Sequence, residues 1–226
     1  METGEFVKID YVARVKDTNE LFDTTKEDAA RKEGVYNEKV KYGPVTFIIG
    51  ADFVIRGLDE ALRGMKAGER KEVEIPPAKA FGEKNEDLVK LMPEAQFKKQ
   101  NIDIQPGAYI NINNIRGKIV SISGGRVKVD FNHPLAGKTL KYDVEVIGVV
   151  TEKPEKVKSI VTYFTGREMT VNVGKEVEIE SAADMHRGLK EIIAQTISKW
   201  VGIETVKFID VFKSATEVEE TIKKEV

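Results

Sequence analysis

Hydrophobic and polar positions alternate along much of the first part of the chain. Residues 6–16, FVKIDYVARVK, put every second side chain on one face of a strand. That face holds Val7, Ile9, Tyr11, Ala13 and Val15. Further strands are predicted at residues 45–50 and 70–77, the latter ended by prolines, and at 140–150, where Tyr142, Val144 and Val146 alternate inward.

Helical spacing replaces alternation between Gly50 and Gly68. The apolar positions Val54, Ile55, Leu58, Ala61, Leu62 and Met65 form one stripe of a short helix. Because predicted strands flank it, we expect this helix to lie across a sheet. The N–H groups of a first helical turn have no partner inside the helix, so the N–H of Ile55 is a candidate to hold a ligand carbonyl.

Residues 83–132 read as a small unit of their own. A helix is predicted near Pro93, and three strand-like segments follow, the last two joined by a Gly124-Gly125 hairpin. Its apolar side chains either fill a small core or stay exposed and bind unfolded chains. The candidates for client binding are Leu88, Leu91, Met92, Phe97, Ile102 and Tyr109.

Beyond residue 150 the pattern predicts a compact α+β domain with a core of its own. Residues 151–158 are charged and contain a proline, which indicates a linker or the edge of a domain. Two short strands, an amphipathic helix at 184–201, a further strand and a polar tail follow. The helix carries Met185, Leu189, Ile192, Ile193, Ile197 and Trp200. Trp200 is expected in the core or in a seam between two chains, and the domain is expected to add client contact or a homodimer interface.

The composition limits the classes of binding partner and the location that we expect for the protein. Thirty-six basic and thirty-eight acidic side chains leave a net charge of −2, which favours neither nucleic acid nor a membrane surface. The absence of Cys excludes disulfides and thiolate metal sites. No signal peptide or membrane span is visible, so we expect a cytoplasmic protein. Abundant Lys and Glu with no Cys also suits a thermophile.

Four motifs in order resemble the FKBP-type peptidyl-prolyl cis-trans isomerases: LFDTT, FVIRGLDEAL, AFG and LKYDVEVIGV. The long segment between AFG and NHPLAG resembles the insert-in-flap, SlyD-like branch, and an archaeal source is expected. The resemblance implies an α+β fold, with an antiparallel sheet wrapped on a short helix. It divides the chain into an isomerase domain (1–82 and 133–150), an inserted, mainly-β chaperone domain (83–132) and a C-terminal α+β domain (151–226) to which the resemblance does not extend.

The resemblance also implies an apolar pocket that accelerates Xaa-Pro isomerisation without metal or cofactor. Its residues would be Tyr11, Phe22, Asp23, Val45, Val54, Ile55, Leu58, Phe81, Leu135 and Tyr142. From the residues alone, Tyr11 is equally a core aromatic, and Asp23 is a turn residue before two Thr. In the family, the matching Asp stands at the pocket rim.

The sequence departs from the family pattern at Leu58, where many members have Trp, and at Phe81, where Tyr is usual. Both changes weaken the expectation of tight macrolide binding. The histidine-rich tail of some SlyD-like proteins is missing, so nickel delivery is not supported. His133, without a second ligand at metal-binding spacing, is expected to be structural. The alternative function is a non-catalytic holding chaperone with a vestigial pocket.

Overall fold

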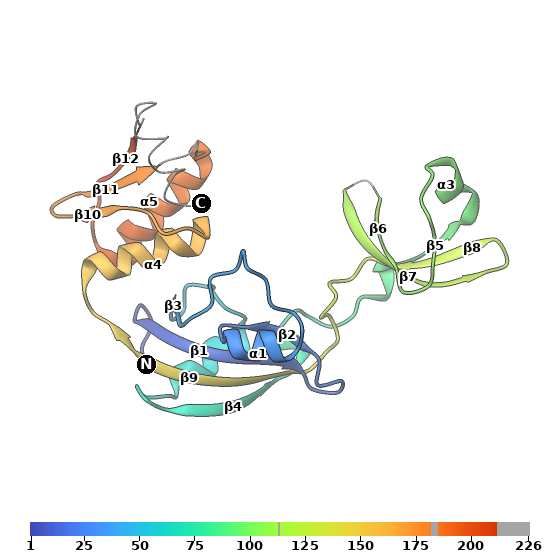
Figure 1. The fold of residues 1–226 in the computed structure, drawn as a ribbon, viewed down its shortest axis with the longest axis horizontal. Coiled ribbons are helices and arrows are strands. Elements are labelled where there is room, and N and C mark those ends of the chain that lie inside the picture. Colours follow the sequence, from blue (N-terminus) through green and yellow to red (C-terminus); the bar gives the residue numbers. More distant parts are fainter. Residues whose placement is uncertain (113, 182–184, 212–226) are drawn as a thin grey trace.

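Three β-sheets with a few helices make up the computed structural model, which describes residues 1–112, 114–181 and 185–211 (Figure 1). The largest sheet lies in the middle of the molecule. A four-stranded sheet projects from one end of it, and a three-stranded sheet with two helices lies at the other end. This mixture of antiparallel sheets and few helices confirms the α+β class and agrees with an FKBP fold.

The main sheet is organised around β1 (Phe6–Val15) and β9 (Leu140–Val150), which pair along their whole lengths. Its order is β2 (Leu21–Thr24), β1, β9, β4 (Arg70–Ile75), and every pair is antiparallel. A fifth strand, β3 (Val45–Ile48), pairs with the first half of β1, while β2 pairs with its second half. Strands β2 and β3 therefore both pair with β1, each along a different half of it.

One face of this sheet buries the predicted alternating positions of β1 beneath α2 (Arg56–Arg63). All five side chains of that face are nearly inaccessible to solvent: Val7, Ile9, Tyr11, Ala13 and Val15. They pack with Leu58, Leu62 and Met65 from the α2 region and with Tyr142, Val144 and Val146 from β9. The predicted period-2 pattern is confirmed. The predicted helix is shorter than its apolar stripe, because Val54, Ile55 and Met65 lie just outside α2.

A glycine sets how closely α2 approaches the sheet. A Cβ added to Gly57, in the first turn of α2, would lie 2.3 Å from Cγ2 of Ile75 on β4. Real Cβ atoms are not found so close to another carbon, so a larger residue would push α2 away from β4. The helix that begins beside Ile55 thus depends on the absence of a side chain at residue 57.

The long polar stretch after β2 contains a helix that the sequence pattern did not predict. It is α1 (Glu27–Lys32), and only Ala30 is buried in it. The short length leaves no hydrophobic period to detect. Its charges are nevertheless ordered as a helix dipole prefers, with Glu27 and Asp28 in the first turn and Arg31 and Lys32 in the last.

The inserted segment forms the four-stranded sheet β5-β8-β7-β6. A 3-10 turn at Pro77–Lys79 precedes the segment. The elements of the segment are a 3-10 turn at Glu86–Leu88, β5 (Val89–Pro93), α3 (Glu94–Lys99), β6 (Tyr109–Ile112), β7 (Ile115–Ser123) and β8 (Arg126–Asp130). The Gly124-Gly125 hairpin is confirmed, with positive φ at both glycines as a tight hairpin turn requires. Strand β5, ahead of α3, was not predicted.

The C-terminal region consists of α4 (Lys153–Thr165), β10 (Val171–Val173), β11 (Val177–Ser181), α5 (Arg187–Val201) and β12 (Val206–Asp210). Its sheet order is β10-β11-β12, with β11 and β12 parallel. The linker interpretation of residues 151–158 is wrong, because α4 begins at Lys153. The predicted helix ends before Gly202 as expected, but it begins at Arg187, so Met185 lies ahead of it. Residue 184 and the polar tail at 216–226 lie outside the described residues.

The core of this region extends onto the main sheet. Phe6, Ile48 and Val150 of the main sheet are buried in the same cluster as Val157, Ile160 and other side chains of α4 and α5. The expectation of a separate core is therefore corrected. Trp200 is half-buried at this contact, beside Gly4, so it lies in a seam within one chain.

The described residues include no helix that is long and apolar enough to cross a membrane.

We predict that Gly57→Ala destabilises the fold although Ala favours helix by about 1 kcal/mol. The added methyl group must displace Ile75, and such overpacking costs about 1–3 kcal/mol. Gly64→Ala, at the end of the same helix, is the matched control, since its Cβ would meet only ordinary contacts. Urea unfolding of both variants measures the difference. Equal midpoints would show that α2 does not depend on this close approach.

Candidate active site

The structure brings most of the predicted pocket residues into one apolar cluster between α2 and the main sheet. Tyr11, Leu58 and Tyr142 are buried in it, and the partly buried members packed against them are Phe22, Val45, Val54, Ile55 and Leu135. These side chains come from four strands or their ends, from the start of α2 and from the loop before β9. They are the residues that the resemblance assigns to the walls of an apolar pocket.

Three aromatic rings of this cluster contact one another. The Tyr11 and Tyr142 rings lie 5.6 Å apart on neighbouring strands, and Phe22 meets Tyr142 edge-on at 5.9 Å. The β1–β9 register pairs Ala13 with Tyr142 and Tyr11 with Val144, so the two tyrosines are diagonal neighbours on one face. The register of this ladder therefore fixes the ring geometry.

Asp23 lies at the edge of the cluster and not in an isolated turn. Its Oδ2 accepts a hydrogen bond of 2.7 Å from the Tyr11 hydroxyl. Thr25 holds the two strands in this position: its Oγ1 accepts from the Tyr11 N–H at 2.8 Å, and its own N–H donates to the Tyr11 carbonyl at 3.1 Å. Asp23 itself is exposed, so one carboxylate oxygen can contact a ligand while the other holds Tyr11.

Both tyrosines of the cluster stay protonated well above neutral pH. Burial is the largest cause that raises the pKa of Tyr11, followed by the neighbouring Asp23 carboxylate. The same two causes raise the pKa of Tyr142. The pocket therefore offers neutral hydroxyl groups and one carboxylate, which suits a site that binds and orients a peptide without exchanging protons with it.

The N–H of Ile55 is placed as expected. Ile55 is the N-cap of α2, and its carbonyl accepts from the N–H groups of Leu58 and Asp59. Within the described parts of the chain, no group accepts a hydrogen bond from the Ile55 N–H. Its side chain packs against the apolar cluster, so this free donor lies beside the apolar walls.

Phe81 differs from the other predicted pocket residues. It is exposed and lies outside the apolar cluster, and its ring stacks flat on His133 with centroids 4.3 Å apart. His133 also accepts a hydrogen bond through Nδ1 from the N–H of Leu135, which turns the chain toward the cluster. The stack thus joins the two segments that lead to and from the insert, and the predicted structural role of His133 agrees with these contacts.

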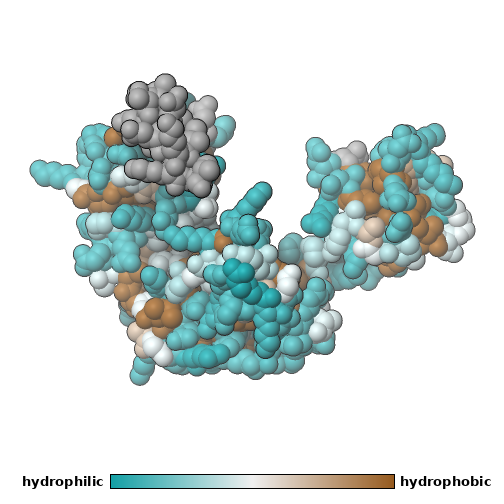
Figure 2. Space-filling view, in the orientation of Figure 1, coloured by the Kyte–Doolittle hydropathy of each residue, from teal (hydrophilic) through white to brown (hydrophobic). Residues whose placement is uncertain are grey.

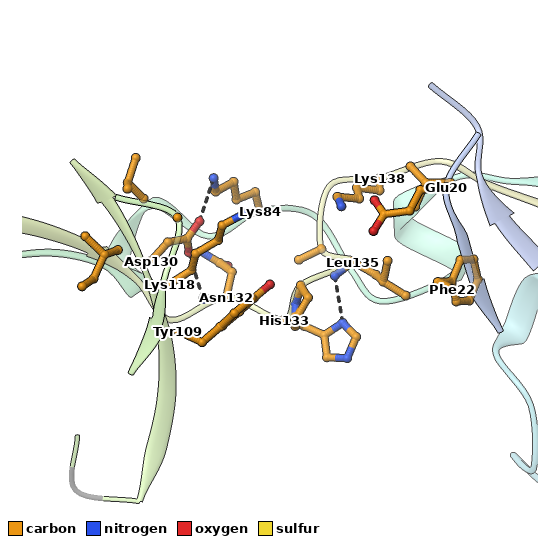
Figure 3. A pocket seen from close by; sticks show the side chains of 16 residues that line it. Glu20, Phe22, Lys84, Tyr109, Lys118, Asp130, Asn132, His133, Leu135 and Lys138 are labelled. Carbon is orange, nitrogen blue, oxygen red and sulfur yellow. Dashed lines mark hydrogen bonds and ion pairs between the residues drawn. The ribbon is translucent and has the colours of Figure 1, made fainter. Parts of the chain in front are cut away.

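An open cleft of about 790 Å³ lies between the insert and the part of the chain built on the main sheet (Figure 3). Phe22, Leu135, Glu20 and Lys138 line one side, and Tyr109, Lys118 and Asn132 line the other. Phe22 and Leu135 belong both to this cleft and to the apolar cluster. The cleft therefore touches the apolar cluster, and its own lining is mixed in polarity.

The predicted client-binding residues separate into exposed and buried groups. Leu88, Leu91 and Tyr109 are exposed, and Figure 2 shows apolar surface gathered on the insert. Met92 and Ile102 pack against the core of the insert. Phe97 is only 1% exposed, because α3 points it into that core, so its assignment to a client-binding surface is corrected.

Sequence reasoning missed several residues of this region. Ile115 and Val120 are exposed on β7, and Val120 lines the cleft. Thr25, which clamps Tyr11, had a signal in the sequence, since it follows Asp23 in the LFDTT motif. The contact between Phe81 and His133 had none, because the two residues are distant in sequence.

No group of three or more His, Cys, Asp or Glu side chains in the described residues is arranged to hold a metal ion.

The comparisons with known proteins agree with this geometry. A family model described as FKBP26, IF domain, matches residues 90–135. The chain is 36% identical over 155 residues to the short-type peptidyl-prolyl cis-trans isomerase of Methanocaldococcus jannaschii, a match that covers 69% of this chain and 98% of the relative.

Two bacterial relatives point the same way. A probable FKBP-type 16 kDa peptidyl-prolyl cis-trans isomerase of Pseudomonas fluorescens is 40% identical over 47% of this chain and 73% of the relative. The FKBP-type isomerase SlyD of Helicobacter pylori is 34% identical over 50% of this chain and 63% of the relative. With the motifs and the apolar cluster in place, this chain belongs to the FKBP-type peptidyl-prolyl cis-trans isomerases.

Proposed function

We propose that the chain isomerises Xaa-Pro bonds of unfolded polypeptides in the apolar cluster around Tyr11 and Tyr142, and that the insert supplies client affinity. The observation that carries the proposal is the convergence of apolar walls, a carboxylate and a free N–H donor at one place. Asp23 and the Ile55 N–H orient the peptide, and the apolar side chains surround the proline.

This arrangement suits the chemistry of amide rotation. The barrier of about 18–20 kcal/mol comes from the double-bond character of the C–N bond, which the twisted state lacks. The planar amide is dipolar and is stabilised by water, while the twisted amide has lost much of that charge separation. An apolar, water-poor pocket therefore disfavours the planar state relative to the twisted one, and each ~1.4 kcal/mol of difference is worth tenfold in rate.

The insert supports the second half of the proposal. Its exposed side chains Leu88, Leu91 and Ile115 lie outside the cleft, while Tyr109 and Val120 line it. An unfolded segment bound to these side chains would have a prolyl bond within reach of Phe22 and Leu135 at the cleft's other side. Capture and isomerisation would then occur on one continuous surface.

Self-association of the chain and its cytoplasmic location remain predictions. Self-association through residues 151–226 has one point in its favour, since Ile192 of the predicted α5 stripe is 48% exposed. Most of that stripe is used within the chain, because Ile193 and Ile197 are buried. A cytoplasmic location is the second expectation.

Refolding of a proline-limited protein in excess chelator tests the proposal. We expect the slow refolding phase to accelerate in proportion to the concentration of this protein, since neither metal nor nucleotide takes part in the proposed chemistry. A slow phase unchanged at micromolar protein would leave holding without catalysis as the function. A slow phase accelerated only without chelator would contradict the metal-free mechanism.

We predict that Asp23→Ala lowers kcat/KM on a proline tetrapeptide by about tenfold and leaves the chain folded, because it removes an orienting hydrogen-bond acceptor. Asp23→Asn keeps an acceptor for the Tyr11 hydroxyl and should lose less. Asp28→Ala, which removes an exposed carboxylate from α1, is the control. Full activity of Asp23→Ala would return this residue to a turn-forming role.

Replacing residues 86–131 by a short loop should preserve activity on the tetrapeptide and reduce it on an unfolded protein. The neck of the insert stays closed in this variant, because Asn85 and Asn132 exchange two hydrogen bonds of 2.9 Å and the N–H of Gly137 donates to Gly82. Leu88→Ser with Leu91→Ser is a milder variant that leaves the buried core of the insert unchanged. An equal loss on both substrates would show that the insert supports the pocket's structure instead.

A further inference from the structure

Helix α4 contacts the segment that leads into the pocket. The ring of Tyr163, near the end of α4, stacks on Phe53 with centroids 3.9 Å apart and planes within 9° of parallel. The Tyr163 hydroxyl also donates a hydrogen bond of 3.2 Å to the Phe53 carbonyl. The next two residues belong to the proposed site: the Val54 side chain is one of its walls, and Ile55 has the free N–H. Tyr163 therefore contacts the residue that immediately precedes the site in sequence.

The segment that Tyr163 holds has an unusual backbone. Asp52 has a φ of +57°, in the left-handed region that a non-glycine residue rarely adopts, and Gly50 also has a positive φ. A side-chain contact from α2 holds its first end, where the Gly50 N–H donates to Asp59 at 2.7 Å. Phe53, at its other end, is held by the stacked ring of Tyr163 and by Phe164, whose ring meets it edge-on at 5.7 Å. A segment with such dihedral angles keeps its shape only when contacts on both sides support it.

A second contact joins Tyr163 to a strand that packs against the apolar cluster. Its ring meets Phe47 of β3 edge-on at 6.4 Å. Phe47 packs against the apolar cluster, and Val45 of the same strand is one of the pocket walls. Tyr163 thus contacts two separate segments, residues 45–48 and 50–55, and each carries residues that we assign to peptide binding.

We propose that Tyr163 is a positioning residue of the isomerase site, through which the C-terminal region sets the place of the Ile55 N–H and the Val54 wall. The inference rests on the proposed roles of these two residues. It gives residues 153–165 a part in the isomerisation of every substrate, in addition to any client contact or self-association. Displacement of an orienting group by about 1 Å is enough to reduce a rate strongly.

Different residues of α4 attach the helix to the main sheet and contact the segment before Ile55. Val157, Ile160 and Val161 are fully buried and attach α4 to the main sheet. Tyr163, by contrast, is 41% exposed. Truncating its side chain therefore removes the stack and the hydrogen bond without opening an enclosed cavity, and α4 remains docked through the buried residues.

The test compares Tyr163→Ala, Tyr163→Phe and Trp200→Ala in the full chain. Trp200→Ala is the matched control, because it truncates an aromatic ring that packs beside Gly4 at the same contact between regions. For each variant, kcat and KM are measured on a proline tetrapeptide, thermal unfolding is recorded, and the Ile55 amide resonance is followed by NMR.

We expect Tyr163→Ala to lower kcat/KM by about tenfold, mainly through KM, and to shift the Ile55 amide resonance. Tyr163→Phe, which keeps the stack and loses the hydrogen bond, should fall between this variant and the unchanged chain. Trp200→Ala should lose stability yet keep kcat/KM within about twofold. Tyr163→Phe provides the decisive comparison if the Ala variant does not fold.

Two results would overturn the proposal: near-normal kcat/KM with an unmoved Ile55 resonance in the Tyr163 variants, or an equal loss of activity in Trp200→Ala. Absence of isomerase activity in the unchanged chain would instead refute the proposed function. The Ile55 resonance would still report whether Tyr163 positions that segment, so the two failures can be distinguished.

Discussion

The pairing of β1 with β9 is the constraint on which the rest of this structure depends. It joins residues 6–15 to residues 140–150 and lies at the centre of the main sheet. Its register brings Tyr11 beside Tyr142, and both rings are buried in the apolar cluster. At its far end Phe6 pairs with Val150, and both side chains are buried against the C-terminal region. One ladder therefore supports both the apolar cluster around the two tyrosines and the contact with the C-terminal region.

Local patterns predicted the faces of elements well, because side-chain periodicity is a property of the chain itself. Alternation in β1 and the stripe of α2 needed no knowledge of partners. The same patterns could not show what covers a face. Phe6 reads as an ordinary strand residue, and only the docked α4 explains why it is buried. Phe97 likewise looked available, whereas the unpredicted neighbour β5 belongs to a sheet that encloses it.

The charged composition at the start of α4 explains why the sequence pattern did not predict this helix. The start of α4 is rich in Lys and Glu around a proline, a composition shared by linkers and by exposed first turns of helices. Its apolar side chains Val157, Ile160 and Val161 begin only after that turn. At the site, a family motif supplied Asp23, and the unpartnered first turn of the predicted helix supplied the Ile55 N–H. Tyr163 has no such local signal. Its importance follows from a contact with Phe53, far away in sequence.

The insert has a core whose members are shared with neither of the other two clusters, and its strands pair only with one another. Its strands pair with partners that are close in sequence, whereas β1 pairs with β9, which is synthesised more than a hundred residues later. During synthesis from the N-terminus, residues 89–130 therefore emerge complete before the main sheet can close. Because local contacts form faster than distant ones, we expect the insert to fold first. The part proposed to capture unfolded chains would then be ready while its own isomerase domain is still one of them.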